Sequence, residues 1–339
     1  MINKELESHK KEFAGTAMSA IANLFPGYFA LIMATGIVSI AAKQLGPEPV
    51  AWVLLAINLA AFLILSCFLI IRIVRFFPRV KADITDHVRG PGFFTVPAAI
   101  CVLGSQLIVV AGYVAPAANL WFVGLVLWGL VIYKFFAAVT TVEKKPPLDK
   151  ALSGAWLIAA VSTQSISVLG TLLVPYFAAQ YHEALLFFTT CMFLIGCMLY
   201  ILLITLIFYR FTFADLTSER LTPPYWINMG AVAITTLAGA RLILAAGDSR
   251  LVNEILPFLK GFTLFFWSAA CWWIPLLFIL GFWRHVVMRY PLRYDPQYWG
   301  LVFPLGMYTV CTVELSRAID FPPLMFIPQV FVYLAYAAW

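Results

Sequence analysis

Three charged side chains stand well inside long apolar stretches of this 339-residue chain: Arg241, Glu314 and Arg317. An ionisable group in hydrocarbon is costly, so such residues usually pair with one another or face water. Arg241 follows Trp226 by 15 residues, and Glu314 follows Trp299 by the same number. We therefore expect both at one depth in neighbouring helices, either as a salt bridge or as part of an anion-attracting cluster.

The charge balance of these three residues favours the attraction of anions, and proton binding by Glu314 is the alternative. Pairing Arg241 with Glu314 leaves Arg317 as an excess positive charge, with Lys43 near the same level. A narrow, hydroxyl-lined path with a net positive mouth favours anions. Alternatively, Glu314 could bind and release a proton that is coupled to transport.

Hydroxyl and amide side chains gather on every second apolar stretch, whereas the stretches between them are bulky and aromatic. Polar side chains are costly in hydrocarbon unless they pair or meet water, so we expect the polar stretches to surround a central pore. The alternative is that small residues only permit close helix packing. The predicted pore-lining residues are Thr35, Gly36, Ser39, Ser105, Gln106, Ser162, Thr163, Thr235 and Thr309.

The composition indicates an integral membrane protein. Hydrophobic residues make up 63% of the chain and charged residues 11%, with a mean hydropathy of +0.93. A soluble domain carries about a quarter charged residues. An outer-membrane barrel would show stretches of ~10 residues with alternating polarity, and this chain has long unbroken apolar runs instead.

Ten apolar segments are long enough to span a bilayer, which takes ~20 helical residues. We expect an all-α protein with a cytoplasmic N-terminal segment at 1–24, in which 2–24 could form a surface helix, and a transport domain at 25–339. The expected spans are 26–42, 50–71, 93–113, 117–142, 151–174, 183–209, 224–247, 257–283, 298–319 and 321–339.

A motif of proline, one further residue and two aromatics opens four of these spans, and a weaker copy, Ser153-Gly154-Ala155-Trp156, opens a fifth. Repeats of this kind define the architecture. Because each period holds two spans, the pattern predicts five parallel helical hairpins around a central pore, with odd helices inside and even helices facing lipid. The strong copies are Pro26-Gly27-Tyr28-Phe29, Pro91-Gly92-Phe93-Phe94, Pro223-Pro224-Tyr225-Trp226 and Pro296-Gln297-Tyr298-Trp299.

Basic residues predict the orientation. The N-terminus and the loops after the even spans hold 16 of the 22 lysines and arginines. The positive-inside rule then places both termini in the cytoplasm of a multi-pass protein of the plasma membrane. The net charge of +6 is thereby explained without a nucleic-acid partner.

The six cysteines lie inside apolar runs and the four histidines are scattered, so we expect neither a metal site nor a cofactor. An intramembrane enzyme would need a cluster of such residues within the bundle, and the sequence shows none. Pro97 and Pro304 stand inside expected inner helices and should bend them. Phe303 precedes Pro304, so its ring either packs in the core or projects toward the axis.

Several segments resemble the tellurite-resistance/dicarboxylate transporter family, which includes slow-type anion channels and fungal malate and sulfite transporters. The resemblance covers about residues 25–339. It is carried by Pro26–Phe29 with Met33-Ala34-Thr35-Gly36-Ile37-Val38-Ser39, by Tyr225-Trp226-Ile227-Asn228-Met229-Gly230-Ala231, and by Trp299-Gly300-Leu301-Val302-Phe303-Pro304-Leu305-Gly306.

The resemblance implies ten helices in five hairpins, a pore lined by the odd helices, and a homotrimer. It also implies that Phe303 corresponds to the phenylalanine that closes the pore of channel members. The intramembrane charges Arg241 and Glu314 look closer to the carboxylate carriers of the family.

Two transport hypotheses follow for this chain in its lipid bilayer. The first is passage of small anions, either inorganic ions or C4-dicarboxylates such as malate, through a pore gated by Phe303. The second is a proton-coupled dicarboxylate, sulfite or tellurite carrier with Glu314 as the proton site. A purely structural membrane scaffold would leave the polar inner helices unexplained.

Overall fold

The computed structural model describes residues 18–339, and these residues form helices, turns and connections without any strand. The expectation of an all-α membrane protein is confirmed at this level. Residues 2–17 of the expected surface helix lie outside the described residues, and residues 18–22 are helical.

Eight helical segments of the described chain are long and apolar enough to cross a membrane, and they coincide with the first eight expected spans. Two expected spans differ. The ninth is a helix of 20 residues that contains Glu314 and Arg317, and the tenth is a shorter apolar helix. The eight segments are Pro26–Leu45, Glu48–Arg75, Gly90–Ala111, Val114–Thr141, Gly154–Tyr176, Ala179–Phe213, Pro223–Leu244 and Leu256–Val287.

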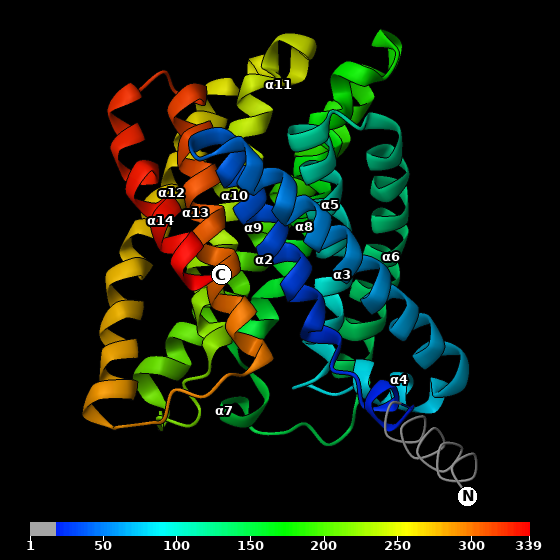
Figure 1. Cartoon of the computed structure of the whole chain (residues 1–339), viewed down its shortest axis with the longest axis vertical. Coiled ribbons are helices and arrows are strands. Elements are labelled where there is room, and N and C mark those ends of the chain that lie inside the picture. The colour runs from blue at the N-terminus through cyan, green and yellow to red at the C-terminus, as the bar shows by residue number, and fades with distance from the viewer. Residues whose placement is uncertain (1–17) are drawn as a thin grey trace, which may run out of the picture.

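Five helices form the centre of the molecule (Figure 1). Each contacts the next, and the last contacts the first, so that they close a ring. Between 67% and 94% of the span window is buried in the four of them that qualify as spans. These inner helices are α2 (Ala30–Leu45), α5 (Thr95–Ala111), α8 (Ile158–Leu173), α10 (Ile227–Leu244) and α13 (Trp299–Ala318).

A second helix follows each inner helix and packs against it from outside. The qualifying spans among these outer helices are only 17% to 39% buried, and large apolar side chains cover their exposed faces. Such a surface suits lipid rather than water. The outer helices are α3 (Glu48–Arg75), α6 (Val114–Thr141), α9 (His182–Phe213), α12 (Leu256–Phe282) and α14 (Phe326–Ala338).

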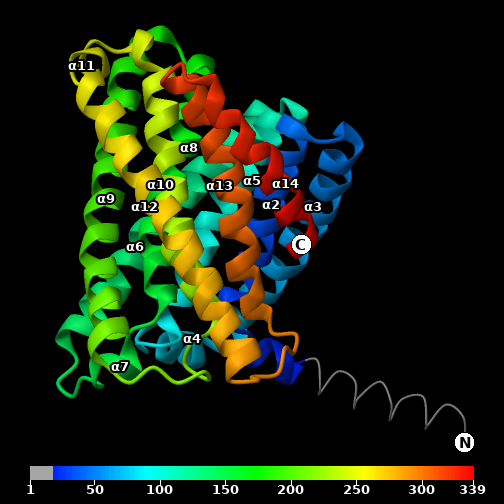
Figure 2. The same ribbon diagram turned by 90° about the vertical axis from the view of Figure 1, so that its left-hand side faces the viewer.

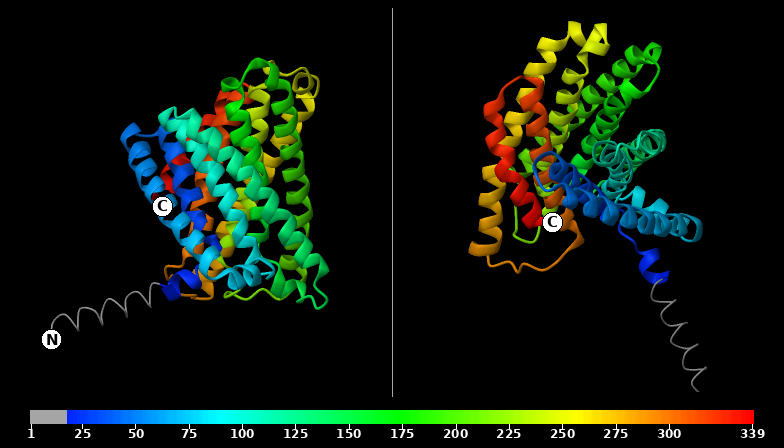
Figure 3. Two further views of the ribbon diagram at one scale, coloured as in Figure 1. Left: turned by 90° about the vertical axis from the view of Figure 1, so that its right-hand side faces the viewer. Right: turned by 45° about the horizontal axis from the view of Figure 1, so that its top comes forward.

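The long helices run along one direction, and their connections gather at two ends (Figures 2 and 3). One end carries α4 (Phe77–Ile84) and α7 (Leu148–Ala151), and the other carries α11 (Arg250–Glu254). We call these the α7 end and the α11 end. The C-terminal residue lies partway along the bundle, and its indole N–H donates to Thr35 Oγ1 at 3.0 Å.

The repeated motif forms a 3-10 turn that leads directly into each inner helix. Proline suits the first turn because its missing N–H has no helical acceptor there and its φ is preset. The five turns contact one another in a ring at a single end of the bundle, so the inner helices run parallel. The turns are η1 (Pro26–Phe29), η2 (Gly90–Phe94), η3 (Gly154–Leu157), η6 (Pro223–Trp226) and η9 (Pro296–Tyr298).

Glycine in these turns permits close approach of neighbouring backbones. A Cβ on Gly92 would stand 2.9 Å from the backbone nitrogen of Gly27, and a Cβ on Gly154 would overlap the carbonyl of Pro224. Neither contact can be relieved by rotating a side chain, because the neighbouring atoms belong to the backbone.

Two details differ from the sequence analysis. The third turn ends at Leu157 rather than Trp156, which shifts the register of that repeat by one residue. Pro97 is the third residue of α5 and lies in its first turn, so it does not interrupt the helix as a deep proline would. Pro304 does lie inside α13, and Pro275 lies inside α12.

Candidate functional site

A narrow cavity of about 20 Å³ lies where all five inner helices meet. It has room for about one water molecule. Its wall is apolar except for two hydroxyls and one thiol. The lining residues are Ile37, Ile40, Cys101, Val102, Ser105, Ser165, Val168, Ile234, Leu237 and Met307.

The repeat determines which residues reach this axial cavity. The motif and the last residue of η3 define five equivalent positions, which are Phe29, Phe94, Leu157, Trp226 and Trp299, the first residue of α13. In every inner helix the residue eight positions later lines the cavity, and in four helices so does the residue eleven positions later. A spacing of three residues keeps both side chains on one helical face. The same spacing identifies Ser165, which the predicted lining omits.

Four of the predicted lining residues bond to outer helices. The Ser39 hydroxyl donates to the Ala51 carbonyl at 2.7 Å, and Gln106 Oε1 accepts from Asn58 at 2.7 Å. Thr163 accepts from the Trp128 indole at 2.9 Å, as Thr35 does from Trp339. These bonds satisfy polar groups between inner and outer helices.

The other predicted lining residues have local partners. Ser105 lines the cavity and donates to the Cys101 carbonyl at 3.0 Å. Gly36 lies against α5, because a Cβ there would meet Val102 at 2.8 Å. The remaining three hydroxyls are fully buried and donate to carbonyls of the preceding turn of their own helices: Ser162, Thr235 and Thr309.

Phe303 lies four residues before the cavity residue Met307, on the same face of α13. One helical turn, about 6 Å, therefore separates it from the axial cavity toward the α7 end. The side chain is 2% exposed. The equivalent position in α10 is Gly230, where an added Cβ would stand 2.7 Å from Pro304 Cγ, so the Pro304 ring occupies the space that a larger residue would need.

The three intramembrane charges meet at the α11 end. Arg241 Nη2 lies 2.9 Å from Glu314 Oε1, and Arg317 Nη1 lies 3.0 Å from the same oxygen. Of the two expected arrangements, a salt bridge or an anion-attracting cluster, the salt bridge between the seventh and ninth spans is present in the structure. Gln44 of α2 donates to this oxygen as well, at 2.7 Å. We call Gln44, Arg241, Glu314 and Arg317 the carboxylate cluster.

Gln44 is absent from the residues predicted for this site, whereas Lys43 is predicted near the level of Arg317. Gln44 follows Phe29 by the same 15 residues that separate Arg241 and Glu314 from their aromatics, so the repeat could have found it. Lys43 forms an ion pair with Glu48. The cluster nevertheless keeps two arginines for one carboxylate.

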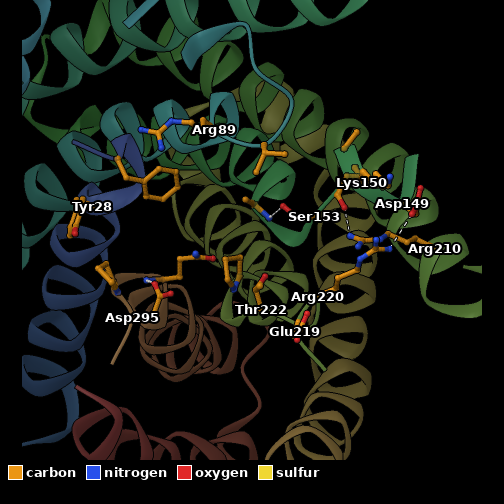
Figure 4. A pocket seen from close by; sticks show the side chains of 18 residues that line it. Tyr28, Arg89, Asp149, Lys150, Ser153, Arg210, Glu219, Arg220, Thr222 and Asp295 are labelled. Carbon is orange, nitrogen blue, oxygen red and sulfur yellow. Dashed lines mark hydrogen bonds and ion pairs between the residues drawn. The ribbon is translucent and has the colours of Figure 1, made fainter. Parts of the chain in front are cut away.

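A larger cavity of about 660 Å³ opens at the α7 end, and residues of η1, η3, η6 and η9 and of the adjoining connections line it. Tyr28 and Asp295 lie on one side of it, and Lys150 and Arg220 lie on the other (Figure 4). Four basic and three acidic side chains line it. These are Arg89, Lys150, Arg210 and Arg220, with Asp149, Glu219 and Asp295.

The electrostatics of this vestibule favour anions. Arg220 pairs with Asp149 at 3.1 Å, and Arg210 bonds to the neutral oxygens of Leu152 and Tyr225. Arg89 pairs with Asp83 at 2.8 Å, but Asp83 also pairs with Arg72, so this group keeps one positive charge in excess. The N-termini of five parallel helices also point toward this end, and each contributes a partial positive charge. Both ends of the axis are therefore net positive, and the middle is narrow and apolar.

Comparison with known proteins agrees with this geometry. The sequence profile of the SLAC1 family, described as voltage-dependent anion channel, matches residues 23–339. An uncharacterized transporter of Methanocaldococcus jannaschii is 24% identical over 329 residues, which are 95% of this chain and 93% of that protein. A second one from this organism is 24% identical over 336 residues, 97% and 94% of the two chains.

A shorter relative shares part of the chain at higher identity. An uncharacterized membrane protein of Mycobacterium tuberculosis is 39% identical over 141 residues, which are 42% of this chain and 71% of that protein.

Proposed function

The chain belongs to the SLAC1 family of voltage-dependent anion channels, and we propose that it carries small anions across a membrane along the axis of its inner helices. One observation supports this most directly. Equivalent residues of all five inner helices converge on the axial cavity, between two net positive ends.

We further propose the membrane arrangement that the sequence predicts. Ten helices would lie in the plasma membrane as five parallel hairpins, with the α7 end and the N-terminus on the cytoplasmic side. The last of them, α14, would run back toward that side, and its final residue Trp339 lies partway along the bundle. The support is the ring of inner helices, the apolar outer faces and the basic connections at the α7 end. Assembly as a homotrimer is proposed from the family resemblance.

Phe303 is proposed as the gate. Its support is its place on the axial face of α13, one turn from the axial cavity, beside a helix whose equivalent residue is glycine. An apolar constriction of this kind resists ions by excluding water. Opening would require the ring to leave its packed position, while Ser105 and Ser165 supply hydroxyls for the anion beyond it.

The substrate class is proposed as small inorganic anions or C4-dicarboxylates such as malate. A second candidate is a proton-coupled dicarboxylate, sulfite or tellurite carrier that uses Glu314. The observation that favours it is the burial of this carboxylate, whose side chain is 1% exposed and whose Oε2 has no hydrogen-bond partner among the described residues.

A reconstituted flux assay tests these proposals. Purified protein in liposomes is given chloride, nitrate, sulfite and malate in turn, with and without an imposed pH gradient. Anion flux above that of protein-free liposomes supports transport, and flux that is indifferent to the pH gradient favours the channel. Dependence on the gradient favours the proton-coupled carrier, and absence of flux for every anion would refute both.

A further inference from the structure

Three donor side chains of the carboxylate cluster gather at one oxygen of its single carboxylate. Gln44, Arg241 and Arg317 each reach Glu314 Oε1, at 2.7 to 3.0 Å. Within the described residues, Glu314 Oε2, Arg241 Nε and Gln44 Oε1 have no partner. A buried ion pair that only stabilises the fold would usually satisfy both carboxylate oxygens.

Two arginines are suited to a second carboxylate. A guanidinium group presents a planar fork of donors that matches a carboxylate with two parallel bonds. Here Arg241 reaches Glu314 through Nη2 and Arg317 reaches it through Nη1, while Arg241 Nε has no partner within the described residues.

The position of the cluster places it at the end of the axial path. Arg241 follows the cavity residue Leu237 by four positions, and Glu314 follows Met307 by seven. Both spacings return to the same helical face. The equivalent residues of α5 and α8 are Val109 and Leu172, so this polar site occupies only the side of the mouth formed by α2, α10 and α13.

The exposure of the side chains decreases from Arg317 through Arg241 to Glu314. The Arg317 side chain is 55% exposed, that of Arg241 is 21% exposed, and that of Glu314 is 1% exposed. A solute that arrives from outside therefore meets the arginines before it meets the buried carboxylate, and it can bind them without first opening the bundle.

From these observations we propose that Gln44, Arg241 and Arg317 form a binding site for the carboxylate group of a small carboxylic acid, and that Glu314 occupies this site when no solute is present. The solute and Glu314 compete for the same N–H donors, and the displaced Glu314 side chain turns away by rotation about its own bonds. The site deepens the proposed function, since it assigns a carboxylate substrate to the α11 end of the path.

The test is a measurement of malate affinity for detergent-solubilised protein, with radiolabelled malate and with chloride as competitor. Glu314→Gln keeps the size of the side chain but removes the competing charge, so malate should bind at least tenfold more tightly. Arg317→Gln removes the most exposed donor of the site, with a side chain that is 55% exposed, and malate should bind about tenfold more weakly. Glu254→Gln is the matched control, because it breaks an exposed ion pair with Arg250 at the same end.

The outcomes separate this site from the alternatives. Unchanged malate affinity in Arg317→Gln overturns the proposal, and so does a folded Glu314→Gln variant that binds malate no more tightly than the wild type. A lower melting temperature of Glu314→Gln with unchanged affinity would mean that the ion pair is purely structural. Malate binding without any anion flux in liposomes would refute the proposed transport and leave the binding site standing. Anion flux together with a malate affinity that neither variant changes would refute the binding site and leave the proposed transport standing.

Discussion

Replacement of Phe303 by alanine is the sharpest test of the proposed gate. The ring is almost fully buried, and it stands one helical turn from a cavity that has room for about one water molecule. A small anion with part of its hydration shell cannot pass such a space, so conduction requires this region to widen. Truncation of the Phe303 ring would widen the path permanently at the level of this residue.

The size of the effect follows from the cost of displacing a packed ring. Removal of a buried phenylalanine side chain costs about 3–5 kcal/mol, and moving the ring out of its packing forfeits similar contacts. Each 1.4 kcal/mol corresponds to about tenfold in rate. The closed ring would therefore suppress flux by about 10²- to 4 × 10³-fold. Because the apolar residues of the axial cavity still narrow the path, we expect an increase of at least tenfold.

The assay is anion efflux from liposomes that contain equal amounts of wild type, Phe303→Ala and Phe266→Ala. Phe266 of α12 is equally buried and packs against Tyr200 and Phe262, away from the axis. It should lower the melting temperature by a similar amount and leave flux unchanged. Wild-type flux in a folded Phe303→Ala variant would refute the gate, and an equal rise in Phe266→Ala would show that the increase is an unspecific leak.

Three further predictions concern packing and orientation. Gly230→Ala should destabilise the protein by about 1–3 kcal/mol, since its Cβ would overlap Pro304. Gly261→Ala is the control, because the space around Gly261 is open. An unchanged melting temperature of Gly230→Ala would contradict the close contact with Pro304. Thr35→Val should lower the free energy of unfolding by about 0.6–1.7 kcal/mol, because it leaves the Trp339 indole without its acceptor. Thr205→Val should lower it less in the same melting assay, because the Thr205 hydroxyl bonds to a carbonyl of its own helix. The orientation can be tested in a cysteine-free background with a membrane-impermeant maleimide applied to intact cells. The reagent should label Glu254→Cys at the α11 end directly, and it should label Lys145→Cys near the α7 end only after permeabilisation. The opposite labelling pattern would refute the proposed orientation.

Periodicity made much of this fold predictable. The recurring motif contains the proline and aromatics that begin each inner helix, and residue spacing along a rigid helix converts directly into depth. That is why Arg241 and Glu314, each 15 residues after an aromatic, are found in contact. The weak copy at Ser153–Trp156 was assigned one residue too early, because without a proline only the backbone shows that the turn ends at Leu157.

The direction in which each polar side chain points was less predictable. Thr35, Ser39, Gln106 and Thr163 have the composition expected of a pore lining, yet they bond to outer helices. A hydroxyl in a buried helix is satisfied equally well by a neighbouring helix or by a wet path, and composition does not distinguish the two. Pro97 is a similar case, since its effect depends on where the helix begins.

Residue order alone predicts the membrane character of the protein, its helices, the fivefold period and the depth of its buried charges, because hydropathy and spacing act locally along the chain. Which residues share the axis, and which partners share Glu314, depends on how the helices pack against one another. Gln44 and Glu314 are 270 residues apart in the chain and 2.7 Å apart in space, and that contact exists only because the ring closes α13 against α2.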